Sequence, residues 1–302
     1  MSDLVGEFPE LQGIMGGYFA EAQGFDKDIS LAVREHYLPV GLDSNTPKKP
    51  FSIALALSDK LDTLVGFFGI DHKPTSSKDP YALRRAALGL IRLLIENNKE
   101  FKLKDLINYS ITLYEEQSFK FTNQSVQKEL TEFLMDRLKY YMREKNIRSD
   151  IIDASLNFFG INEITKIYKK SIVLNKYIND EIGISIVSIY KRASNILSYE
   201  LNNKELEISN SIDPVLFKSE YEKNLYKKIH ELRKYFTSIN RDENYDLTLK
   251  NLADSKKVIF EFFDNVKVND EDKTIKKNRL ELLHLFCRTF DNYILFSSIE
   301  SL

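Results

Sequence analysis

Hydrophobic residues recur along most of the chain at the three- and four-residue spacing of amphipathic helices. One such stripe collects Leu83, Ala86, Ala87, Leu90 and Leu94. Asp79-Pro80 precedes the stripe and is typical of a helix start, because Asp accepts bonds from free N–H groups and Pro is tolerated in a first turn. We therefore predict a helix from this pair onwards, with Arg92 outside the buried stripe.

Three further stretches show the same periodicity. A helix over about 125–145 would bury Leu130, Phe133, Leu134, Leu138 and Tyr141. Another would bury Ile259, Phe262, Phe263 and Val266, and the last would bury Leu280, Leu283, Cys287 and Phe290. The run 182–189 alternates like a strand, but its continuation to Leu197 favours a helix. These patterns predict an all-α protein.

Turn-forming residues divide the sequence unevenly. Nine of the 11 glycines and six of the 7 prolines precede residue 90, so turns should concentrate there and long helices should follow. The polar segments 202–213 and 240–246 should connect helices in the second half.

Composition excludes few functions. The 302 residues are 43% hydrophobic and 29% charged, with a net charge of −2. We find no apolar run long enough to span a membrane and no secretory signal at the N-terminus. The lone Cys287 excludes an internal disulfide and fits the reducing cytoplasm, where we expect the protein to lie. We expect its thiol to be a core group.

Motifs for catalysis or metal binding are not evident. The four histidines lack zinc-site spacing, and no phosphate-loop, dinucleotide-binding or nucleophile-elbow motif occurs. Asp59 and Asp62 would share one helix face and could hold a cation, although capping and ion pairing are the more common roles of such a pair. We expect no metal site and no catalytic residue.

Basic residues in the second half lie close to aromatic ones. Lys191 and Arg192 follow Tyr190, and Lys276, Lys277 and Arg279 open the last predicted helix. Such residues can contact phosphates and stack on bases. Interspersed acids fit a solvated face of mixed charge equally well.

Several long strings then point to a family. They are GEFPELQGIMGGYFA (6–20), REHYLP (34–39), ALALSDKLDTLVGFFGI (54–70), PTSSKDPYALRRAALGLIRLL (74–94), FLMDRLKYYMRE (133–144), DIIDASL (150–156), YKRASNIL (190–197) and KNRLELL (277–283). In this order and spacing they closely resemble the β subunit of the bacterial two-subunit glycyl-tRNA synthetase. The resemblance extends over the whole chain.

The resemblance implies a domain order and a fragment. An HD-like helical domain, present only in part, would occupy residues 1–96, a helical linker 97–185, and an anticodon-binding bundle similar to that of arginyl-tRNA synthetase 186–302. Family β subunits are considerably longer, so this chain would be a C-terminal fragment that is inactive alone. An HD phosphohydrolase needs a His-Asp dipeptide, whereas Asp71-His72 has the reverse order.

The resemblance also implies a division of labour. In the family's α2β2 tetramer, the α subunit uses ATP and Mg²⁺ to activate glycine and transfers it to tRNA-Gly, while the β subunit binds the tRNA. No cofactor is then expected in this fragment. Binding of the anticodon is expected from Lys191, Arg192, Lys276, Lys277 and Arg279.

Alternatives remain at this stage. Arg279 could instead form an ion pair with Asp264 or Glu261, or cap a helix within the bundle. The whole chain could also be a metal-dependent HD-type phosphohydrolase or a helical scaffold without a role in RNA binding.

Overall fold

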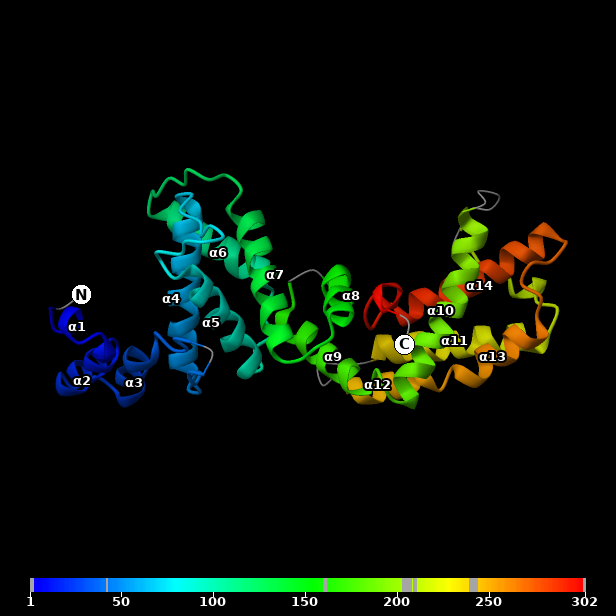
Figure 1. The fold of residues 1–302 in the computed structure, drawn as a ribbon, viewed down its shortest axis with the longest axis horizontal. Helices are drawn as coiled ribbons and strands as arrows, with labels where there is room; N and C mark the ends of the chain where they lie inside the picture. The colour runs from blue at the N-terminus through cyan, green and yellow to red at the C-terminus, as the bar shows by residue number, and fades with distance from the viewer. Residues whose placement is uncertain are drawn as a thin grey trace. The chain divides into compact units, whose positions relative to one another are not determined.

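The computed structural model describes residues 3–41, 43–159, 162–202, 208, 211–238 and 244–300. Within these ranges every regular element is an α-helix or a 3₁₀ helix, which confirms the all-α prediction (Figure 1). The described helices include none that is both long and apolar enough to cross a membrane. The chain forms two compact units, 1–146 with 160–168, and 147–159 with 169–302. The predicted boundaries at 96 and 185 stay predictions.

The first unit is built around a long central helix. Its elements are α1 (Asp3–Glu7), η1 (Pro9–Leu11), α2 (Ile14–Ala22), α3 (Lys27–Glu35), α4 (Pro50–Gly69), α5 (Leu83–Glu96), α6 (Leu103–Glu116), α7 (Val126–Glu144) and the start of α9 (Ile164–Tyr177). Helix α4 packs against α3, α5, α6 and α7. In α7, which was predicted within two residues, Leu130, Leu134 and Leu138 are fully buried.

Helix α5 starts later than the sequence predicts. It begins at Leu83, because Ala82 takes a left-handed conformation with φ of 55° and ends the preceding turn. The predicted capping still operates across that turn. The Asp79 carboxylate accepts bonds from the backbone N–H groups of Leu83 at 2.8 Å and Arg84 at 2.9 Å. The predicted stripe is otherwise correct, with Leu83 and Leu94 each 1% exposed.

Arg92 is buried, contrary to our prediction that it lies outside the stripe. It is 6% exposed, and its Nε donates to Glu96 at 2.7 Å. Its other nitrogens donate to the carbonyls of Gly41 and Ser44 in a neighbouring loop. A guanidinium with its donors satisfied in this way can be buried at much lower cost than an isolated charge.

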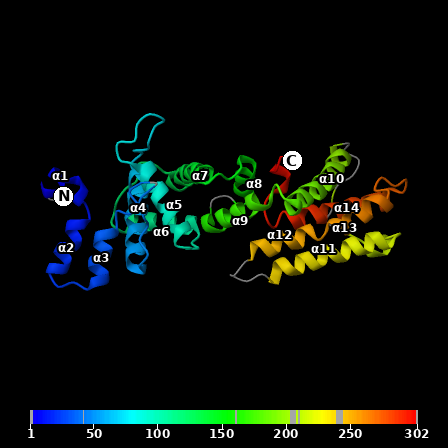
Figure 2. The same ribbon diagram turned by 60° about the horizontal axis from the view of Figure 1, so that its bottom comes forward.

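The second unit is a helical bundle. Its elements are α8 (Ser149–Phe159), the rest of α9, α10 (Glu181–Asn202), η2 (Pro214–Leu216), α11 (Glu220–Ser238), α12 (Tyr245–Ala253), α13 (Lys256–Asn265), α14 (Lys273–Phe290) and η3 (Phe296–Ser298). Helix α10 packs on α12, α13 and α14, and α11 packs on α13 and α14 (Figure 2). The run 182–197 is therefore helical, as predicted.

The core of this unit is rich in aromatic rings from its last 20 residues. Phe286, Phe290, Tyr293 and Phe296 are at most 1% exposed, and Cys287 is buried beside them, as predicted for a core thiol. The predicted polar connections at 202–213 and 240–246 fall largely outside the described residues. Of the second, Tyr245 and Asp246 already belong to α12, which Asn244 caps.

Candidate nucleic-acid interface

The start of α14 determines where three of the five candidate cations lie. Asp272 caps this helix by accepting from the N–H of Thr274 at 2.8 Å. Ile275, Leu282, Leu283 and Phe286 then form its buried side. Arg279 is one turn from Ile275, Leu282 and Leu283, and its register therefore directs it into the bundle.

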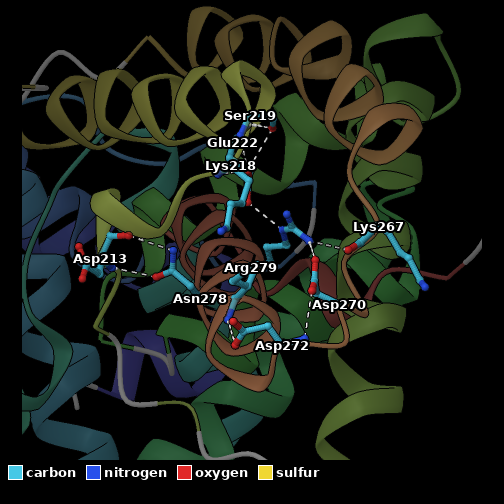
Figure 3. A network of polar contacts seen from close by, with 10 residues as sticks. Asp213, Lys218, Ser219, Glu222, Lys267, Asp270, Asp272, Asn278 and Arg279 are labelled. Atoms are coloured by element: carbon cyan, nitrogen blue, oxygen red, sulfur yellow. Dashed lines mark hydrogen bonds and ion pairs between the residues drawn. The ribbon is translucent and has the colours of Figure 1, made fainter.

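Arg279 lies at the centre of a buried polar network (Figure 3). It is 6% exposed, and its Nε donates to Glu222 on α11 at 2.7 Å. Its Nη1 donates to the Asp270 carboxylate at 2.7 Å and to the Lys267 carbonyl at 2.8 Å. The guanidinium thus joins α11, α14 and the loop before α14.

Glu222 is fully buried, and its charge is satisfied from two directions. One carboxylate oxygen faces Arg279, while the other accepts from the backbone N–H groups of Lys218 and Ser219, each at 2.8 Å. These N–H groups precede α11, so Glu222 also anchors the start of that helix. In the loop before α14, the Asp272 backbone N–H and the Arg279 guanidinium hold the pKa of Asp270 below its usual value.

The arrangement favours the structural role of Arg279 over direct contact with RNA. Its acidic partners are Glu222 and Asp270, and not the Asp264 or Glu261 expected from sequence. Those two residues lie on α13, where Asp264 approaches Arg192 and Glu261 approaches Lys257, each pair at 3.9 Å. The predicted RNA contact of Arg279 remains a prediction.

Arg192 on α10 is the most exposed of the five candidates. Its side chain keeps 43% of its surface accessible, and its guanidinium carbon lies 4.4 Å from the centre of the Phe263 ring on α13. Phe260 lies further off, at 5.8 Å. Since the ion pair with Asp264 is long and solvated, it should contribute little to stability. The arginine is thus held on an aromatic ring and remains open to solvent.

The other candidates are less accessible. Lys276 forms a short ion pair with Glu200 at 2.6 Å, and both side chains are largely buried, at 13% and 9%. Lys191 and Lys277 are half-buried. The structure therefore does not gather the five residues into one exposed cluster. It places Lys276 and Arg279 in contacts between helices and leaves Arg192 exposed.

A hollow that the sequence analysis missed lies on the same unit. It measures about 340 Å³, and we name it the α11–α14 hollow. It is lined mainly by Tyr226, His230, Arg233, Glu281, His284 and Leu285. A signal for it existed: Tyr226, His230 and Arg233 are spaced four and then three residues apart, which places them on one helix face.

A metal centre finds no support in the described residues. They contain no group of three or more His, Cys, Asp or Glu side chains that could hold a metal ion. Asp59 and Asp62 both lie on α4, as the predicted shared face requires. The carbonyl of Asp62 accepts from the hydroxyl of Tyr114 at 3.2 Å.

Comparison with known proteins gives the class of the helices from α10 onwards and then the family of the chain. Residues 186–296 match the DALR anticodon binding domain, so the helices from α10 onwards form a domain of the class that binds tRNA anticodons. Residues 1–157 match the glycyl-tRNA synthetase beta subunit family, and this match covers more than half of the chain. The chain belongs to the glycyl-tRNA synthetase β-subunit family.

Individual relatives agree with this assignment. The glycine–tRNA ligase beta subunit of Rickettsia typhi is 38% identical over 98% of this chain and 42% of its own length. The beta subunit of Rickettsia canadensis is 38% identical over 99% of this chain and 43% of its own length. The beta subunit of Cereibacter sphaeroides is 37% identical over 94% of this chain and 41% of its own length. The chain thus spans about two fifths of the length of these relatives.

Proposed function

We propose that this chain is the tRNA-holding C-terminal part of a glycine–tRNA ligase β subunit, and that residues 186–302 bind the anticodon region of tRNA-Gly. The observation that carries the proposal is the match of residues 186–296 to an anticodon-binding domain within a chain of this family. Anticodon bases are single-stranded, so their edges and faces are available to side chains of a helical bundle.

The proposed role of this chain is to position the tRNA. The overall reaction joins glycine to tRNA-Gly with conversion of ATP to AMP and pyrophosphate, and we assign its chemistry to a partner α subunit in an α2β2 tetramer. Binding the anticodon arm would fix the acceptor end relative to that active site, so that binding energy is converted into orientation. The fragment would hold no cofactor, ATP and Mg²⁺ being bound by the α subunit, and the enzyme would work in the cytoplasm.

Arg192 is the residue to which we assign a phosphate contact. Its guanidinium is exposed yet restricted by the Phe263 ring, so less conformational entropy is lost on binding than for a free arginine. Lys191 and Lys277 are half-buried and could add contacts from α10 and α14. Lys276 and Arg279 would act by holding these helices in place.

The test is tRNA binding by this chain at several stated salt concentrations. Fluorescence anisotropy should show tighter binding to tRNA-Gly than to the same tRNA carrying a different anticodon. Arg192→Gln should weaken binding to both tRNAs and lower the slope of log K against log salt by about one. The control is Lys257→Gln on α13, which removes the same charge from an 85% exposed side chain. Equal and negligible binding of both tRNAs would refute the assignment and favour a scaffold.

A further inference from the structure

The α11–α14 hollow has the size and the polar groups of a site for one small planar ligand. Its volume of about 340 Å³ is near the lower end of the range for ligand pockets, about 300–1,000 Å³. Two helices supply its walls, and residues 211–212 contribute a third side. The hollow is therefore formed by elements that are already packed together.

Its α11 wall includes two aromatic rings. The rings of Tyr226 and His230 lie 4.4 Å apart between centres, at 73° to each other. The rings of Phe217 and Tyr226 also pack together, with 5.4 Å between their centres, which restricts the tyrosine ring. His230 itself is exposed. Both rings line the hollow, and aromatic rings can stack on a planar group or pack against its edge.

Its α14 wall offers hydrogen-bonding groups at depth. Glu281 is only 1% exposed, and His284 follows one turn later and is half-buried. Burial, together with the positive charge of Arg288, lowers the pKa of His284 and so favours the neutral ring, which has one donor and one acceptor nitrogen. A carboxylate can accept several hydrogen bonds at once. Glu281 already has a partner within the chain, so a ligand would use the remaining acceptor capacity of its carboxylate.

We propose that the α11–α14 hollow receives one unstacked base of the tRNA anticodon loop that carries an exocyclic amino group, with Glu281 accepting a hydrogen bond from that group. This inference rests on the proposed function and identifies the place where a base is read. Carboxylates are natural partners of amino groups on base edges. Tyr226 and His230 supply the stacking surface that single-stranded bases use. The exposed Arg233 lies at the rim, where it can pair with a neighbouring phosphate.

Uracil is the base that this site should reject. It has no exocyclic amino group, and it would place a carbonyl oxygen against the carboxylate. Cytosine, adenine and guanine all carry the amino group, and the positions that tolerate no change to uracil will show which of them is bound. A wrong base at a read position typically costs a factor of about 5 to 150 in affinity.

The experiment uses this chain and a series of tRNA-Gly transcripts. In each transcript one amino-bearing base of the anticodon loop is replaced by uracil. For the wild-type chain, one position should lose about 5- to 150-fold in affinity. In Glu281→Gln the discrimination at that position should fall to about threefold or less, because the amide can both donate and accept. The matched control is Glu231→Gln, which makes the same charge change at an exposed position of α11 outside the hollow.

Glu281 is buried, so Glu281→Gln could fail to fold, and a second variant tests the hollow independently. His230→Ala alters an exposed ring of the same hollow and should weaken tRNA-Gly binding several-fold, with the helical circular dichroism unchanged. The proposal is overturned if the wild-type chain distinguishes anticodons but Glu281→Gln keeps the full discrimination against uracil at every position. In that case the proposed function stands and the base is read elsewhere. If the wild-type chain distinguishes no anticodon, both proposals fail together.

Discussion

Replacing Arg279 by methionine separates a structural arginine from one that contacts RNA. The substitution keeps an unbranched apolar side chain on α14 and removes the donors that reach Glu222, Asp270 and the Lys267 carbonyl. If the network of Figure 3 describes the role of Arg279, the main effect should be on stability.

The magnitude follows from what remains after the substitution. Glu222 is fully buried and keeps its bonds from the Lys218 and Ser219 N–H groups, but its negative charge loses its cationic partner. Removing one partner of a buried ion pair costs about 3–5 kcal/mol. The Asp270 side chain is 31% exposed and can turn to water, so the loss of its ion pair with Arg279 should add little to the cost. We expect the free energy of unfolding to fall by about 3–4 kcal/mol.

The assay is urea unfolding followed by circular dichroism, together with hydrogen exchange of α11 and α14, because two compact units need not unfold together. The double variant Arg279→Met/Glu222→Leu should lose less than the sum of the two single losses, since neither charge is then left unpaired. Lys277→Met is the control: it removes the same charge from the same helix at a half-buried position. Its cost should stay below about 1 kcal/mol.

One result would refute this reasoning about Arg279. It is a stability within about 0.5 kcal/mol of the wild type, combined with weaker tRNA binding and a salt slope lower by about one. Arg279 would then contact a phosphate, as the sequence analysis expected.

Two further predictions concern stability alone. Asp79→Ala should lower the free energy of unfolding by about 0.5–2 kcal/mol, because the N–H groups of Leu83 and Arg84 lose their acceptor; urea unfolding measures this, and no change would contradict the capping. For Asp291, burial raises the pKa from 3.8 to about 6, so the folded state holds this proton more tightly and the contribution of Asp291 to stability falls as pH rises from about 4 to 6. The free energy of unfolding of Asp291→Asn should therefore rise by about 1–2 kcal/mol relative to the wild type across that interval, a value reduced because the carboxylate is partly exposed. Unfolding midpoints of both proteins at several pH values measure this difference, and a difference that does not change with pH would contradict it.

The helices could be predicted from sequence because their apolar stripes are a local property. The stripes of α7, α13 and α14 could be predicted from the helical period of 3.6 residues alone. The start of α5 could not be found in this way. The left-handed conformation of Ala82 breaks the expected path, and no residue type at that position announces it. The interpretation of Arg92 failed for a related reason, because two of its acceptors are loop carbonyls about 50 residues earlier.

The same limit applies to the site. The register of α14 already indicated that Arg279 is buried, since Leu283, Phe286 and Phe290 follow it at four, seven and eleven residues. Its partner Glu222 is 57 residues away on α11, so it is determined by how two helices pack and not by any local pattern. The α11–α14 hollow likewise needs the face of one helix to meet the face of another. Periodicity gives each face but not their pairing.

The distribution of charge indicates how such a domain would select its RNA. Two of the five candidate cations, Lys276 and Arg279, are engaged in buried ion pairs, and the whole chain has a net charge of −2. Phosphate attraction, which is independent of sequence, can therefore supply only part of the affinity. Rings and buried polar groups that meet bases act only on an unstacked loop. An interface in which two of the five candidate cations are already paired within the bundle would thus gain selectivity for its tRNA by limiting its attraction for all other RNA.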